Sequence, residues 1–210
     1  MDTKPSVHSS IRRTINSFRK GYIFTVNLDS IASKGSRETV NKSLSRLVEE
    51  GLIKRIRIGV YYKPSYSKFY ANKALPPDIH KTACVIAKHN HEKLQIHGAT
   101  ATNLLGLSTQ NTMYYVFFTT GSTREIEVSG VRIKFIHTSN KKIMQHSGTK
   151  LGIVISALFY LDKELTTPQM IKQIKSSLTE DEFTKLINSN LENWMYEALT
   201  SDENKYVRHY

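Results

Sequence analysis

Apolar side chains recur every three or four residues in two stretches of the first fifty positions, which predicts two amphipathic helices. The first is expected to end at Gly21. The other follows Ser36, a good N-cap residue, and ends at Gly51. Between them, residues 28–33 are expected to form a brief helix before a tight turn at Lys34-Gly35. The predicted core stripes are Val7, Ile11, Ile15 and Phe18, and then Val40, Leu44, Leu47 and Val48.

The pattern changes directly after Gly51. Residues 52–62 are typical of two short strands joined by a turn at Ile58-Gly59, and Tyr22-Ile-Phe24 can pair with them as a third strand. Three helices followed by a basic hairpin is the order of a winged helix-turn-helix, which lays its third helix in a DNA major groove. The sequence therefore predicts a winged helix-turn-helix DNA-binding domain over residues 1–64.

The remaining residues predict further helices and strands. Residues 65–77 mix prolines with tyrosines, which indicates a linker that packs rather than a free tether. Residues 78–162 predict a mixed α+β domain, and residues 163–210 predict a helical tail of two or three amphipathic helices. The fold class is α+β. Within 78–162, helices are expected over 78–88, 98–105 and 151–161, strands over 94–96 and 113–119, and a hairpin around Ser129-Gly130.

The charge of the chain is concentrated at its N-terminal end. The net charge is +12, and the first 70 residues hold 14 basic and 5 acidic side chains, or +9 of it. Such a field attracts a polyanion, and counterion release from phosphates drives binding. RNA and an anionic membrane surface also fit the charge, as does a basic protein whose charges are only solvated. The single cysteine and the absence of a membrane-length apolar run predict a cytoplasmic protein without disulfides.

The polar face of the predicted third helix holds the candidate base contacts. Arginine suits guanine, asparagine suits adenine, and lysine and serine suit phosphates. A polar helix face is usually only solvated, so the adjoining turn and hairpin decide in favour of DNA contact. Hairpin arginines position a protein on the DNA backbone, although charge on an edge strand also guards against aggregation. The candidates are Ser36, Arg37, Asn41, Lys42 and Ser45 in the helix, and Lys54, Arg55 and Arg57 in the wing.

The second half contains few residues that suggest catalysis. Three histidines near Cys84 follow no zinc-ligand spacing, and no glycine-rich phosphate loop appears, so we expect no metal and no cofactor. Glu125 and Glu127, with Lys134, faintly resemble a nuclease core. Both glutamates fall on the polar side of the predicted hairpin, which favours solvated pairs with Arg132 or Lys134. We therefore expect no enzymatic activity. The histidines are His89, His91 and His97, and the polar side chains that packing leaves unexplained are Thr100 and Asn103.

Short motifs distributed along the chain carry a family resemblance. In the first 64 residues they are Gly21-Tyr-Ile-Phe-Thr25, Gly35-Ser-Arg37, Leu44-Ser-Arg-Leu-Val48, Gly51-Leu-Ile53 and Arg57-Ile-Gly-Val-Tyr61. Beyond them lie Leu75-Pro-Pro-Asp78, His97-Gly-Ala-Thr-Ala-Thr-Asn-Leu-Leu-Gly-Leu-Ser108 and Tyr115-Val-Phe-Phe-Thr-Thr-Gly-Ser122. In this order they resemble the AbiEi-type abortive-infection antitoxins of type IV toxin-antitoxin systems, and more specifically a related family of unknown function. The resemblance extends to about Leu161; Ile58 departs from it by replacing the more usual basic residue.

The resemblance implies a role in phage defence. Such antitoxins repress their own operon through the N-terminal domain and oppose a co-encoded nucleotidyltransferase-like toxin through the second domain, generally without a tight complex. The implied partner is double-stranded DNA of the protein's own operator, bound by a protein that is monomeric in solution, with two copies on inverted or direct repeats. An ordinary winged-helix transcriptional regulator whose second domain senses a ligand or protein is the alternative, and a nuclease comes third.

Overall fold

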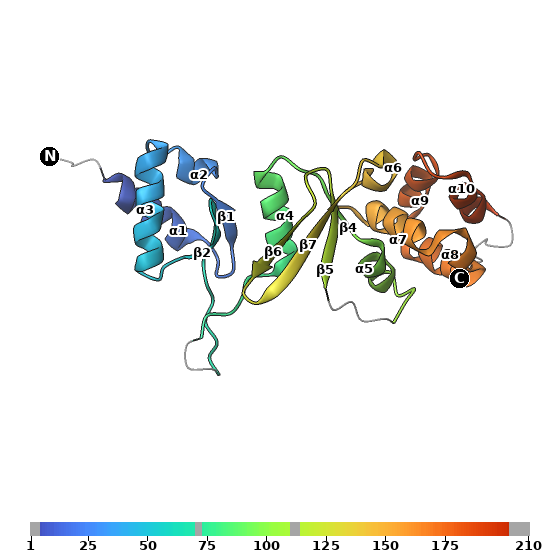
Figure 1. The fold of residues 1–210 in the computed structure, drawn as a ribbon, viewed down its shortest axis with the longest axis horizontal. Helices are drawn as coiled ribbons and strands as arrows, with labels where there is room; N and C mark the ends of the chain where they lie inside the picture. Colours follow the sequence, from blue (N-terminus) through green and yellow to red (C-terminus); the bar gives the residue numbers. More distant parts are fainter. Residues whose placement is uncertain (1–4, 70–72, 110–113, 202–210) are drawn as a thin grey trace. The chain divides into compact units, whose positions relative to one another are not determined.

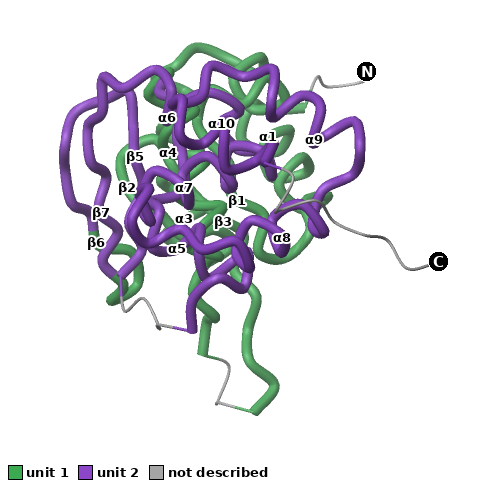
Figure 2. The backbone as a smooth tube through the Cα atoms, turned by 90° about the vertical axis from the view of Figure 1, so that its right-hand side faces the viewer, with its two compact units in different colours: residues 1–91, 127–131 green, residues 92–126, 132–210 purple. Residues whose placement is uncertain are grey.

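The computed structural model describes residues 5–69, 73–109 and 114–201. The chain divides into two compact units (Figure 2). Unit 1 comprises residues 1–91 and 127–131, and unit 2 comprises residues 92–126 and 132–210. Within the described residues, no helix has the length and apolar character needed to cross a membrane.

Unit 1 begins with three helices and a three-stranded antiparallel sheet (Figure 1). The helices are α1 (Val7–Ser17), α2 (Asp29–Ala32) and α3 (Arg37–Glu49), and the strands are β1 (Ile23–Thr25), β2 (Lys54–Arg57) and β3 (Val60–Tyr62). The sheet order is β1-β3-β2, so β3 is central and the predicted third strand pairs with the hairpin. The predicted helices, hairpin and strand over residues 1–64 are therefore all present.

Local interactions fix the ends of these helices. The Ser36 hydroxyl accepts a hydrogen bond from the Thr39 amide at 3.3 Å, which confirms the predicted N-cap of α3. Gly51 follows α3 with a φ of +74°, a conformation that favours glycine. The end of α1 differs from the prediction: it ends at Ser17, well before Gly21. The ammonium of Lys63 caps it by donating to the carbonyls of Asn16 and Phe18, each at 2.8 Å.

The predicted apolar stripes form the core of unit 1. Side chains of α1 and α3 pack on those of the sheet and α2, and this arrangement buries the stripes away from the polar face of α3. Val7, Phe18 and Val48, which were predicted to be core residues, are only partly buried at its edge. The buried residues of this core are Ile11, Ile15, Phe24, Val26, Ile31, Val40, Leu44, Leu47, Ile53 and Tyr61.

Unit 1 also contains α4 (Ile79–His89), which packs on β1. Asp78 caps it as predicted, since its carboxylate accepts from the Lys81 amide at 2.8 Å. The compact unit thus extends past residue 78, where the predicted second domain begins. In the predicted linker, Tyr66 pairs with Ala74, while residues 70–72 of that linker lie outside the described residues.

The second sheet, which belongs to unit 2 except for residues 127–131 at its β6–β7 turn, has four strands in the order β4-β5-β7-β6. The strands are β4 (Leu94–Ile96), β5 (Tyr115–Thr119), β6 (Arg124–Val128) and β7 (Val131–His137). As predicted, β5 is central, although Met113 of that prediction lies outside the described residues. It pairs antiparallel with β4 and parallel with β7. The predicted hairpin turn is present, with φ of 52° at Ser129 and 83° at Gly130, as a type I′ turn requires.

Helices complete unit 2. They are α5 (Gly98–Leu104), α6 (Lys141–Met144), α7 (Lys150–Leu165), α8 (Pro168–Ser177), α9 (Glu180–Ile187) and α10 (Asn193–Thr200). Gly98 lets α5 approach α7, since a Cβ there would lie 2.1 Å from the Cβ of Tyr160. The predicted tail helices α8–α10 share one hydrophobic core with α7, including Val154, Leu158 and Ile174. The tail is therefore an integral part of unit 2.

A largely buried ion pair ties three segments of this sheet together. Arg124 Nη2 of β6 lies 2.6 Å from Glu92 Oε2, and the side chains are only 19% and 12% exposed. The same carboxylate oxygen accepts from the Thr119 hydroxyl at 2.9 Å, and the guanidinium lies 4.3 Å from the centre of the Phe135 ring. By contrast, Arg132 and Glu125 form an exposed pair at 3.7 Å on the same hairpin, as the sequence predicted for Glu125.

We expect Arg124→Ala to lower the free energy of unfolding of unit 2 by about 3–5 kcal/mol, because it leaves Glu92 buried without its counter-charge. The matched variant Arg132→Ala, which removes the exposed pair, should cost less than about 1 kcal/mol. Urea unfolding followed by the fluorescence of Trp194, the single tryptophan and a residue of α10, measures both values. Equal costs for the two variants would contradict the assigned role of the buried pair.

Candidate nucleic-acid interface

The polar face of α3 is exposed along its first two turns. Arg37, Asn41 and Lys42 are all exposed, and Ser45 is half-buried. Ser36 is also exposed, but its hydroxyl caps the helix and contacts the Thr39 hydroxyl at 2.8 Å. Because the apolar stripe points to the core, the candidate contacts on α3 share one solvent-facing surface, with Ser36 committed to the helix end.

The hairpin is joined to α3 through Arg55. Its guanidinium donates to the Ser45 hydroxyl at 3.1 Å and lies 5.5 Å from the centre of the Tyr61 ring. Lys54 and Arg57 are exposed, and the register of β2 shifts between Arg55 and Arg57. Such an irregularity bends a strand and changes the direction of its side chains. The structure therefore brings two predicted contacts, Arg55 and Ser45, together across the helix and the wing.

The turn at the tip of the hairpin lies against the segment that follows β1. The Val26 amide donates to the Gly59 carbonyl at 2.9 Å, and next to it the Arg37 guanidinium donates to Asn27 Oδ1 at 3.4 Å. Ile58, at the turn, is 88% exposed. Asn27 is a residue that sequence reasoning missed, because its role depends on the non-local pairing of β1 with β3.

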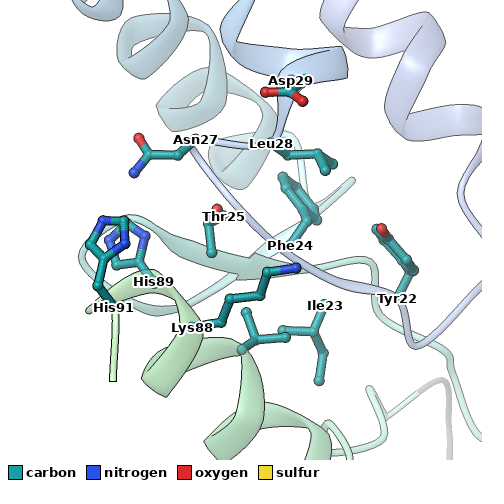
Figure 3. Close-up of a pocket in the computed structure, with 11 residues that line it drawn as sticks. Tyr22, Ile23, Phe24, Thr25, Asn27, Leu28, Asp29, Lys88, His89 and His91 are labelled. Carbon is teal, nitrogen blue, oxygen red and sulfur yellow. The ribbon is translucent and has the colours of Figure 1, made fainter. Parts of the chain in front are cut away.

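The last turn of α4 lies at the same place and was also missed. A pocket of about 400 Å³ is bounded by β1 and the segment after it on one side and by α4 on the other (Figure 3). Lys88, His89 and His91 line it from α4 and the residues just after it. Desolvation, and then the charges of Arg57 and Arg37, lower the pKa of His89 from its ordinary value of 6.5. In the sequence, these residues stand out only as a cluster of histidines, whose spacing matches no metal site.

The other two titratable candidates, His97 and Cys84, have pKa values that are shifted by burial and by neighbouring charges. The pKa of His97 is lowered by desolvation and by Lys134. Its ring centre lies 4.9 Å from the ring centre of Phe118, and its Nδ1 caps α5 by accepting a hydrogen bond from the Ala99 amide. Desolvation and the Asp78 carboxylate raise the pKa of the Cys84 thiol, opposite to the shift that activates a nucleophile. Over the described ranges, no group of three or more histidine, cysteine, aspartate or glutamate side chains is placed to hold a metal ion.

Comparison with known sequences and structures assigns the chain to a family. The sequence model of the Family of unknown function (DUF6088) matches residues 10–186, so the protein belongs to that family. The match covers most of both compact units and extends into the predicted tail through α8 and all but the last residue of α9. No curated protein and no solved structure matches the chain.

The wing turn depends on Gly59, and its replacement tests how tightly the turn packs. Gly59 has a φ of +77°, and a Cβ there would lie 3.1 Å from His89 Nε2. Gly59→Ala should lower the free energy of unfolding by about 1–2 kcal/mol from backbone strain, with a further loss from this contact. Urea unfolding followed by circular dichroism measures the change.

Gly51→Ala is the matched control for this substitution. Gly51 has a φ of +74° but no atom within 4 Å of the added Cβ, so the control carries the backbone strain alone. The excess cost of Gly59→Ala over Gly51→Ala should vanish when both substitutions are made in a His89→Ala background and each cost is measured relative to His89→Ala alone. An excess that persists without the imidazole would show that His89 does not support the turn.

Proposed function

We propose that residues 1–64 are a winged helix-turn-helix DNA-binding domain and that the protein represses transcription of its own operon. One observation carries the proposal: α3 exposes Arg37 and Asn41 on a surface beside which Arg55 holds the basic hairpin through Ser45. A helix and a hairpin joined by this hydrogen bond present their side chains to a nucleic acid as a single surface. Charges that were only solvated would not require such a bond.

The two halves of the surface are suited to different parts of DNA. Arg37 and Asn41 are four residues apart and lie one above the other on α3, so both side chains can enter one major groove. Arginine pairs with guanine and asparagine with adenine, each good bidentate contact discriminating by about 1–3 kcal/mol. Lys42, Lys54 and Arg57 fit phosphates, which set position rather than sequence. A single α3 reads one half-site, so we propose two copies on repeated half-sites of the operator.

The proposed role of unit 2 rests on the family resemblance. We propose that it opposes a co-encoded nucleotidyltransferase-like toxin in the cytoplasm, without forming a tight complex. The resembling segments are placed centrally in this unit: residues 97–108 contain α5, which packs on α7, and residues 115–122 contain the central strand β5. A motif in the centre of a unit supports a shared fold for that unit, and through it a shared role.

We expect the wild-type protein to bind its own upstream DNA tightly in the presence of nonspecific competitor. Arg37→Ala/Asn41→Ala should abolish the preference for that DNA, since both side chains are proposed to read bases. Arg55→Ala/Arg57→Ala should weaken binding to every sequence and lower the salt slope by about one to two units, because these residues are proposed to neutralise phosphates. Electrophoretic mobility shifts at several salt concentrations measure both effects.

A matched double variant separates surface contact from net charge. Arg13→Ala/Arg19→Ala removes two exposed arginines at α1, outside the proposed surface, and equals the loss of charge in the wing variant. It should leave specificity unchanged and shift the salt dependence less than the wing variant does. Equal and weak binding to any DNA by all four proteins would refute sequence-specific repression.

The antitoxin role predicts a phenotype for unit 2. Expression of a neighbouring nucleotidyltransferase-like gene should stop growth, and co-expression of this protein should restore it. Arg37→Ala/Asn41→Ala should restore growth as well as wild type from an independent promoter, because neutralisation is assigned to unit 2. Growth assays with both proteins under separate promoters test this. Failure of the wild type to restore growth would favour the ordinary regulator with a sensing domain.

A further inference from the structure

We propose that the C-terminal end of α4 binds a phosphate of the DNA backbone through His89 and His91, as a third contact element beside α3 and the hairpin. This inference rests on the proposed DNA-binding function and names a phosphodiester as the ligand of one further part of that surface. The sequence placed all candidate DNA contacts in α3 and the hairpin, and none in α4.

His89 lies against the wing turn. A Cβ atom built on Gly59 would be 3.1 Å from His89 Nε2 and 3.4 Å from its Cε1, so the imidazole edge occupies the space that the glycine leaves open. The hydrogen bond from the Val26 amide to the Gly59 carbonyl holds this turn in place. The end of α4 therefore lies against the tip of the hairpin that carries the proposed phosphate contacts.

Burial and basic side chains from three segments act on His89. Desolvation is the largest cause that lowers its pKa, and Arg57 of the hairpin, Arg37 of α3 and His91 after α4 disfavour its charged form further. Arg37 and Arg57 take part in none of the ion pairs between described residues. A phosphate is the group that neutralises several such charges at one point.

The pocket of Figure 3 is lined by both histidines and gives the ligand its approach to them. Lys88, His89 and His91 line it from the side of α4, with Asn27 and the carboxylate of Asp29 on the other side (Figure 3). Its basic and acidic side chains are thus Lys88, the two histidines and one carboxylate, Asp29. The two histidines and Asn27 lie toward the same end of the pocket in this view. We place the phosphate at that end, where the amide of Asn27 adds hydrogen-bonding capacity.

One polar atom at this position has no hydrogen-bond partner among the described residues. Nδ1 of His89 is buried and forms no hydrogen bond within the described part of the chain. Buried polar atoms in folded proteins are generally hydrogen-bonded, so such an atom indicates a position that a ligand or a water completes. In this proposal the His89 ring is neutral in the free protein and becomes protonated beside a bound phosphate.

Binding of DNA is consequently coupled to protonation. In the free protein the pKa of His89 lies below 6.5, and a phosphate near Arg37 and Arg57 raises it in the complex. A group whose pKa is higher in the complex adds affinity at pH values below the free pKa. That contribution is lost as the pH rises through the pKa of the complex. One fully coupled proton changes the dissociation constant by at most about tenfold per pH unit.

The test compares operator binding by the full-length protein at about pH 6 and about pH 8 at one ionic strength. His89→Gln and His91→Gln keep a polar side chain that does not titrate. At the lower pH His89→Gln should weaken binding by up to about tenfold and reduce the salt slope by up to about one unit, and at the higher pH it should approach the wild type. His91→Gln should weaken binding because it removes the proposed contact of that side chain. His80→Gln is the control, because His80 is exposed in the first turn of the same helix.

Proton uptake gives a readout that needs no variant. Calorimetric titration of wild type with operator DNA in two buffers of different ionisation enthalpy should show net uptake of protons at about pH 6.5, reduced in His89→Gln. Specific binding with no proton uptake, or with a pH dependence that His89→Gln leaves unchanged, would overturn the phosphate contact and leave the repressor proposal standing. Absence of specific binding by wild type at either pH would instead refute the proposed function, and this inference with it.

Discussion

The pairing of β3 along both of its edges is the constraint on which the proposed interface depends. Val60, Tyr61 and Tyr62 are all buried, with β1 on one side and β2 on the other. An isolated two-stranded hairpin is marginal in water, so β1 supplies the pairing that makes the wing a stable part of the unit. Tyr61 also stacks on Phe24 with ring centres 5.8 Å apart, which connects the wing to the core beneath α1 and α3.

Because the sheet fixes the positions of the helix and the hairpin, the hydrogen bonds across the surface serve to orient side chains. The hydrogen bonds from Arg55 to Ser45 and from Arg37 to Asn27 are exposed, and exposed polar contacts of this kind add little to stability. They hold each guanidinium in a narrow range of positions at small cost. Exchanging such a contact for a phosphate or a base edge is therefore easy, because the burial of β3, and not these links, secures the fold.

Local chemistry was sufficient to predict most elements. The cap at Ser36, the glycine after α3 and the turn at Ser129-Gly130 act within a few residues, so the sequence indicated them correctly. Contacts between distant segments carried no such signal. Neither the parallel pairing of β5 with β7 nor the ion pair between Glu92 and Arg124 follows from any short pattern. The grouping of α4 with the first unit is of the same kind, since it depends on packing against β1.

The candidate site, too, could be predicted only where it depends on local sequence. The exposed face of α3 could be predicted from its apolar stripe, whereas Gly59, Arg57 and Arg37, which act on His89, lie thirty or more positions away in the sequence. The surroundings of His89 also include charged side chains that form no ion pair with another described residue. Arg12 and Glu50 pair at 2.9 Å between α1 and α3, but Arg37 and Arg57 beside His89 have no acidic partner among the described residues. Like charges held together destabilise the free protein, and a polyanion that binds only the folded form recovers that loss. The unpaired charges of Arg37 and Arg57 thus support the proposed binding of a polyanion separately from the family resemblance.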